Sequence, residues 1–223
     1  MDGGDEKENN AIYGGVAQDE SWTLTASGRK MMFLQPTTES VCLLDITLHL
    51  SQICRFTGGS SQFYSVAQHS VFVAALVKQA LDNESVSNQT VEYWDQILAA
   101  LFHDAEEAYM SDISSPLKSC IEGKYNWIAE GIRLKIYERY GIDSGYYNAT
   151  VKAADNAAVL VERYYLMPDH PDWPKVPRSE MTYARPIFMG PEDARWRFID
   201  AIEMALKMRD ALRRESCTLQ ASS

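Results

Sequence analysis

Cysteine and positive charge are both scarce in this 223-residue chain. The chain has four cysteines, Cys42, Cys54, Cys120 and Cys217, and no CxxC pair. This spacing argues against a disulfide framework and against a thiolate zinc site. Lys and Arg number 21 against 31 Asp and Glu, a formal net charge of -10. Because so acidic a surface repels a phosphate backbone, we expect neither DNA nor RNA as a partner.

Long apolar runs are missing as well. No stretch reaches the roughly 18 apolar residues that a membrane-spanning helix needs. The first ten residues, MDGGDEKENN, are polar and acidic, unlike a secretory signal. We therefore expect a cytoplasmic protein without a membrane partner.

The rest of the composition is that of one globular domain, with 46% hydrophobic residues. Polar composition predicts a flexible acidic leader over residues 1–20 and a frayed tail over residues 215–223. A Ser27-Gly28 turn signal within residues 21–36 predicts a short hairpin or extended arm. The domain itself is expected over residues 21–214.

Helical periodicity dominates the chain after this arm. Apolar residues recur three or four apart, with capping and stop signals, over residues 45–53, 65–81, 90–110, 121–140, 148–166 and 191–214. The sequence therefore predicts an all-α single domain, a bundle of about five to seven helices with a short N-terminal arm.

Polar side chains interrupt this apolar pattern in the segment AALFHDAEEAYM. On one helix, His103, Asp104 and Glu107 would lie at 0°, 100° and about 40°, within a single arc. Burying an imidazole and carboxylates is costly unless a partner neutralises them. A divalent metal is such a partner, and the His-Asp doublet would supply one nitrogen and one oxygen ligand.

Two residues elsewhere offer the remaining ligands. His69 falls in the aliphatic stripe of residues 65–81, and Asp155 stands among apolar neighbours with Lys152 as its local cation. Together the four residues have the order H-x33-HD-x50-D. This order predicts a mononuclear metal site with Glu107 beside it as an acid or base.

Each position also has a plain structural explanation. A lone histidine such as His69 can be a hydrogen-bonded core residue, and Asp155 can serve a helix N-terminus. The His-Asp doublet is common, and we interpret Glu106 as part of a solvated face. Either the core or a subunit interface would accommodate the tyrosines Tyr146, Tyr147, Tyr164 and Tyr165.

The order of these residues on a helical chain resembles the HD-domain metal-dependent phosphohydrolases. Two blocks, RFTGG…FYSVAQHS (residues 55–70) and LFHDAEEAYMSDISSPLK (residues 101–118), are similar to a branch found in bacteria and phages. That branch includes phage dATP triphosphohydrolases and, more distantly, bacterial deoxyribonucleoside 5′-monophosphatases. The likeness covers residues 22–206.

The resemblance implies roles for individual residues. Glu107 would position or activate the attacking water, and Asp112 would lie near the scissile phosphate. Arg55 and Phe56 would line the nucleoside pocket, and Lys118 would contact phosphate. Without the resemblance, these last three would equally fit surface salt bridges and a core aromatic. Four residues would bind the metal: His69, His103, Asp104 and Asp155.

This sequence departs from the family at two places. Gly59 stands where many relatives have His, and Ser111 stands where Gly is usual. Contacts on that side of the substrate are therefore not carried over.

The function that the resemblance implies is metal-dependent hydrolysis of deoxynucleotides, with dATP as the best single substrate. The products would be deoxyadenosine and triphosphate, or phosphates removed stepwise. Two alternatives stay open: a deoxyribonucleoside 5′-monophosphatase, and a catalytically silent regulatory HD module that binds a nucleotide or a protein partner. We expect one divalent ion, Zn, Mn, Co or Fe, with Mg accompanying a triphosphate, and a homo-oligomer as in the relatives.

Overall fold

A helical bundle forms the body of the protein. The computed structural model describes residues 21–121, 123–175 and 185–221. Within these ranges, eight α-helices and one two-stranded sheet confirm the predicted all-α class. The helices are α2 (Leu43–Gln52), α3 (Val66–Asn83), α4 (Val91–Leu101), α5 (Glu107–Met110), α6 (Ser115–Cys120), α7 (Lys124–Tyr140), α8 (Ala149–Leu166) and α9 (Pro191–Ala221). Three short 3-10 turns connect them: η2 (Thr38–Ser40), η3 (Phe56–Gly58) and η4 (Ser144–Tyr146).

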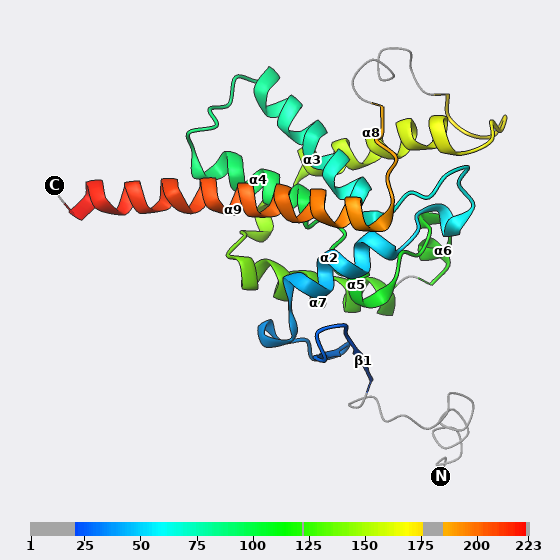
Figure 1. Ribbon diagram of the computed structural model, residues 1–223, viewed down its shortest axis with the longest axis horizontal. Coiled ribbons are helices and arrows are strands. Elements are labelled where there is room, and N and C mark those ends of the chain that lie inside the picture. The colour runs from blue at the N-terminus through cyan, green and yellow to red at the C-terminus, as the bar shows by residue number, and fades with distance from the viewer. Residues whose placement is uncertain (1–20, 122, 176–184, 222–223) are drawn as a thin grey trace, which may run out of the picture.

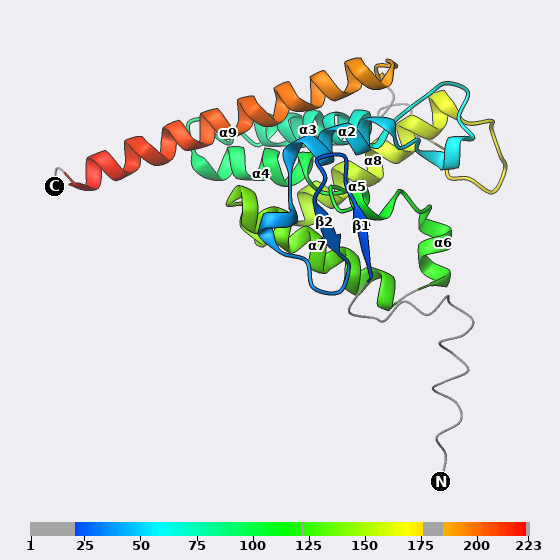
Figure 2. The same cartoon turned by 60° about the horizontal axis from the view of Figure 1, so that its bottom comes forward.

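The N-terminal arm is a hairpin, as its turn signal predicts. Strands β1 (Trp22–Leu24) and β2 (Lys30–Met32) pair antiparallel, and Gly28 has a φ of +79° in the turn between them. The turn is held to the bundle because the backbone N–H and the hydroxyl of Ser27 both donate to the buried carboxylate of Asp45, each at 2.7 Å. The hairpin is therefore fastened to α2 (Figure 2).

Helix α3 lies at the centre of the bundle and contacts α2, α4, α8 and α9. It begins at a capping box in which Ser65 and Gln68 satisfy each other's backbone N–H groups. Most of its apolar face is buried, and His69 lies on that face with no exposed surface. The centre of the core therefore carries an imidazole.

The single helix expected over residues 90–110 is wrong. α4 ends at Leu101, and α5 begins only at Glu107. Between them the backbone hydrogen bonds join residues that are three apart instead of four, as from the N–H of Ala105 to the carbonyl of Phe102. The imidazole Nδ1 of His103 lies 2.8 Å from the carbonyl of Ala100, a group left without a helical partner when the helix ends. The His-Asp doublet therefore lies in a turn. It does not share a single helix with Glu107, contrary to the expectation from the sequence.

The C-terminal helix is longer than the sequence predicts. α9 runs along the bundle and projects well past it at its C-terminal end (Figure 1). The frayed tail expected from residue 215 is therefore helical as far as Ala221. The helix is held near this end because Arg209 and Arg213 both pair with the buried Asp95 of α4.

Some sequence predictions fall outside what the structure describes. The leader expected over residues 1–20 is outside the described residues. In the part of the chain that is described, no helix has both the length and the apolar character required to cross a membrane. All four cysteines are free thiols.

Candidate metal centre

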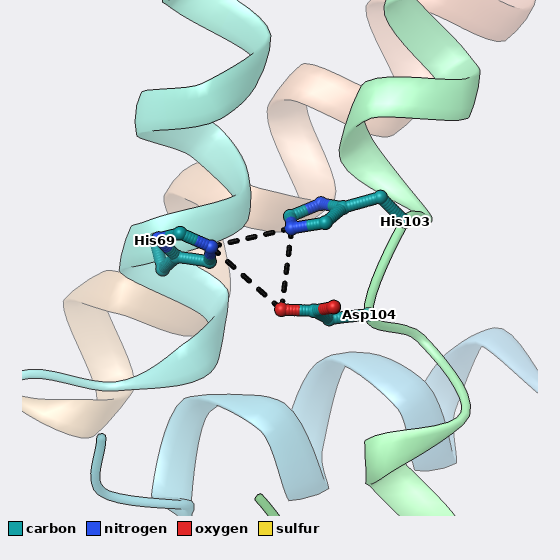
Figure 3. Close-up of side chains that lie close together, drawn as sticks. All are labelled: His69, His103 and Asp104. Carbon is teal, nitrogen blue, oxygen red and sulfur yellow. Dashed lines mark hydrogen bonds and ion pairs between the residues drawn. The ribbon is translucent and has the colours of Figure 1, made fainter. Parts of the chain in front are cut away.

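Three of the predicted ligands meet at the middle of the bundle. His69 comes from α3, and His103 with Asp104 comes from the turn after α4 (Figure 3). The two Nε2 atoms lie 3.2 Å apart, and Asp104 Oδ2 is 3.2 Å from Nε2 of His103 and 3.7 Å from Nε2 of His69. These three side chains form a group that could hold a metal ion.

Asp155 of α8 approaches the same two nitrogens. Its Oδ1 lies 3.1 Å from His69 Nε2 and 3.8 Å from His103 Nε2. It stands outside the tightest three-residue group but within reach of both imidazoles. We call His69, His103, Asp104 and Asp155 the metal-site cluster.

The cluster is closed on its nitrogen side and open on its oxygen side. The side chains of His69 and His103 are 0% and 1% exposed, whereas those of Asp104 and Asp155 are 21% and 31% exposed. Two buried nitrogen ligands and two partly exposed carboxylates would leave one side of an ion accessible to water. This donor set fits a divalent cation with a free coordination position.

The carboxylates of the metal-site cluster are stabilised by positive charge close to them. Burial alone would raise the pKa of Asp155 and lower that of His103. The mutual pairing outweighs burial, so the pKa values of Asp104 and Asp155 fall below the usual range and the pKa of His103 rises well above its own. A divalent cation would supply such positive charge, and its binding would displace a proton from His103.

The predicted acid or base, Glu107, lies next to the predicted phosphate contact. Lys118 Nζ donates to Glu107 Oε1 at 2.7 Å, and the carboxylate is 2% exposed. The other oxygen, Oε2, is buried without a hydrogen-bond partner. Burial and the charges of Asp104 and Asp112 raise the pKa of Glu107 well above its usual value. A raised pKa of this kind is typical of carboxyl groups that take part in proton transfer.

Asp112 is half-buried, and its charge acts on the same groups. Burial raises its pKa, with Asp104 adding to this effect and Arg55 opposing it. Asp112 therefore lies where the charges of Asp104 and Arg55 act on it, and its place near the scissile phosphate stays a prediction.

Arg55 is buried beside the metal-site cluster and does not form a surface salt bridge. It is 9% exposed, and its Nη1 lies 3.8 Å from Asp104 Oδ2. Its guanidinium lies 5.7 Å from the ring centre of Phe56, which is half-buried. Phe56 and Thr57 both have left-handed backbone, with φ of 54° and 55°. Such strain costs of order 1–3 kcal/mol per residue and gathers at functional sites.

Sequence reasoning missed two buried glutamates. Glu106, expected on a solvated face, is 7% exposed and pairs with Arg133 at 3.4 Å, and burial raises its pKa to about 7. Glu162 of α8 is fully buried and lies 2.7 Å from the Nδ1 of His69. One signal could have found it: Glu162 comes seven residues after Asp155, which is two turns along the same helix face.

Comparison with known proteins gives relatives that share most of this chain. No known family model matches the sequence. YfdR of Escherichia coli (strain K12), described as an uncharacterized protein, is 35% identical over 174 residues, which are 76% of this chain and 88% of that protein. RCAP_rcc00048 of Rhodobacter capsulatus, also described as uncharacterized, is 30% identical over 147 residues, 64% of this chain and 71% of that protein.

Proposed function

This chain belongs to the same family as YfdR of E. coli and RCAP_rcc00048 of R. capsulatus, and we propose that it is a metal-dependent phosphohydrolase acting on deoxynucleotides. One observation carries this proposal. Two buried imidazoles turn their Nε2 atoms toward each other and toward two partly exposed carboxylates. Each of these nitrogen–nitrogen and nitrogen–oxygen distances is shorter than 4 Å. The motif blocks that resemble HD-domain phosphohydrolases supply the reaction class.

The metal-site cluster would hold one divalent ion, Zn, Mn, Co or Fe, and Mg would accompany a triphosphate substrate. When bound, such an ion lowers the pKa of a coordinated water and polarises a phosphoryl oxygen. His69 and His103 would supply the buried nitrogens, and the exposed edges of Asp104 and Asp155 would face the substrate. Positive charge gathered here would attract a phosphate that the acidic surface repels.

Glu107 would move the proton in this reaction. Lys118 holds its Oε1, so that Oε2 is the oxygen able to take a proton from the attacking water. Lys118 lies beside this carboxylate and would contact the phosphate as a point charge, while Arg55 would offer a planar fork of donors. The ring of Phe56 would provide a face for the base.

A nucleotide panel tests the proposal. The protein is incubated with each dNTP and dNMP in the presence of Mn, Co, Mg or Zn, and phosphate, pyrophosphate and triphosphate are separated by chromatography. We expect dATP to give deoxyadenosine and triphosphate. Turnover of dAMP without dATP would move the substrate to a monophosphate. Inertness toward every nucleotide would contradict the enzymatic proposal and favour a regulatory module.

Glu107→Gln is the matched control for this panel. It replaces the proposed proton acceptor with an amide of the same shape and leaves the metal-site cluster intact. We expect turnover to fall by about 100-fold or more while metal binding is retained, because general acid–base catalysis contributes factors of this order. Equal turnover of wild type and variant would exclude Glu107 as the proton acceptor.

A further inference from the structure

Glu162 joins two parts of the site that are far apart in the sequence. Its Oε1 lies 2.7 Å from Nδ1 of His69 and accepts a hydrogen bond from the hydroxyl of Tyr64 at 2.9 Å. Its Oε2 faces Nε of Arg55 at 3.3 Å. The carboxylate is completely buried. One side chain therefore contacts a predicted metal ligand and a predicted substrate contact at once.

The contact with His69 determines which ring nitrogen is available. An ionised carboxylate only accepts hydrogen bonds, so the Nδ1 of His69 must carry the proton that it donates to Glu162. The lone pair of a neutral ring is then on Nε2, the nitrogen 3.1 Å from Asp155. The ring is held from both sides by two residues of α8, Glu162 and Asp155.

The second histidine of the cluster is oriented in a parallel way. The Nδ1 of His103 lies 2.8 Å from the backbone carbonyl of Ala100, so its Nε2 also faces the cluster. A backbone carbonyl fixes one imidazole and a buried side chain fixes the other. Of these two acceptors, only Glu162 can be replaced by mutation.

We propose that Glu162 is a positioning residue that orients His69 for metal binding and holds Arg55 at the edge of the site. This inference rests on the proposed function, because it requires the metal-site cluster to bind an ion. Burying an ion-paired carboxylate adds little stability compared with packing an apolar residue in the same place. Its position is instead explained by what it does to His69 and Arg55.

Metal affinity tests the first half of the proposal. Binding of Mn²⁺ is measured by electron paramagnetic resonance of the free ion for wild type, Glu162→Ala and Glu162→Gln. Loss of a carboxylate behind a metal-bound histidine weakens metal binding by about 10–100-fold, and we expect this for Glu162→Ala. Glu162→Gln retains an acceptor for Nδ1 but loses the charge, and we expect a smaller, measurable loss.

Binding of inorganic phosphate to the Mn²⁺-loaded protein tests the second half. In Glu162→Gln the amide no longer neutralises Arg55, and its NH₂ group is a poor neighbour for a guanidinium donor. We therefore expect phosphate affinity to fall severalfold. If Glu162→Ala does not fold, Glu162→Gln decides both halves, because unchanged Mn²⁺ and phosphate affinities in that variant would overturn the proposal.

Asp95→Asn is the matched control. Asp95 is another buried, ion-paired carboxylate, but its partners are Arg209 and Arg213 of α9. We expect this variant to bind Mn²⁺ and phosphate like wild type. A similar loss of Mn²⁺ affinity in Asp95→Asn and Glu162→Ala would reduce Glu162 to a purely structural role and overturn the inference.

A spectroscopic measurement separates positioning from packing. The ¹⁵N resonances of the His69 ring in the Zn²⁺-loaded protein report which nitrogen carries the proton, and the chain has only four histidines to assign. We expect the proton on Nδ1 in wild type and mixed or altered protonation in Glu162→Ala; a proton on Nε2 of wild-type His69 would overturn the inference. Failure of wild type to bind any metal would contradict the proposed function itself. Wild-type affinity in Glu162→Ala would overturn only the role of Glu162.

Discussion

Among the described residues, the carboxylate of Asp95 and the metal-site cluster are both largely buried, and they are neutralised in different ways. In the first, Asp95 of α4 accepts hydrogen bonds from Arg209 at 3.2 Å and from Arg213 at 2.9 Å. Arg209 also donates to the carbonyls of Tyr140 and Gly141, at the end of α7. The chain supplies all the positive charge that this carboxylate needs, and the result joins three helices.

In the second cluster the chain supplies carboxylates and imidazoles that face one another. Asp104 and Asp155 converge on the Nε2 atoms of His69 and His103, and the carboxylates remain partly exposed. The guanidinium of Arg55 comes no closer than 3.8 Å to Asp104 and is shared with Glu162. A buried cluster saturated by arginines serves stability, whereas one left short of cations can bind one from solution.

Removing Asp95 should produce the largest loss of stability. Asp95→Ala leaves two arginines without their buried partner, and breaking a buried ion pair in this way costs about 3–5 kcal/mol. We expect the free energy of unfolding, measured in urea, to fall by this amount. Metal affinity should not change.

The exposed pair between Lys78 and Asp82 provides the control for this prediction. Its side chains are 58% and 47% exposed. Pairs of this kind contribute little to stability, so Lys78→Ala should leave the urea midpoint close to wild type. A loss in Lys78→Ala as large as that in Asp95→Ala would contradict the contrast between buried and exposed pairs.

Metal should stabilise the protein by an intermediate amount, acting through the second cluster only. An ion at 100 times its dissociation constant adds about 2.7 kcal/mol to the free energy of unfolding. For a chain of this size, that corresponds to a rise in Tm of roughly 5–11 °C. We expect Mn²⁺ to raise the Tm of wild type and of Asp95→Asn relative to EDTA.

Asp155→Ala should abolish this increase while the protein stays helical. Asp155 is the predicted ligand that reaches both Nε2 atoms from the α8 side, so its loss opens the coordination shell. Thermal unfolding followed by circular dichroism measures both the helix content and the shift. An equal Mn²⁺-induced shift in Asp155→Ala and wild type would remove Asp155 from the ligand set.

The difference between the clusters also explains what the sequence could predict. Helical periodicity found the long helices because apolar residues on one face, as in α3 and α8, must be buried wherever they occur. It missed the end of α4 at Leu101, where the His103 side chain contacts the carbonyl of Ala100, because no periodic pattern encodes such a contact. It also missed the last turns of α9, residues 215–221, which lie beyond the arginines that pair with Asp95.

The same division holds for the site. His69 and Asp155 could be found because each is a polar residue on an apolar face, and the structure brings both beside the His-Asp doublet. Glu162 lies two turns after Asp155 on the same face, but its partners Tyr64 and Arg55 are about one hundred residues away. The spacing therefore marks its position and not its role.

The smallest predicted effect is a pH dependence that belongs to the metal site alone. Burial raises the pKa of Asp112 in the folded protein above its ordinary value of 3.8, and Asp104 adds to this effect. The folded state therefore keeps this proton where the unfolded chain has lost it. The resulting stability is complete below pH 3.8 and is lost as the pH rises through the folded-state pKa. Asp112→Asn, which has no such proton, should become more stable relative to wild type as the pH rises above 3.8. Urea midpoints of the EDTA-treated proteins across this range measure the difference, and a variant that loses stability relative to wild type as the pH rises would show that Arg55 and Lys118 outweigh burial at this position.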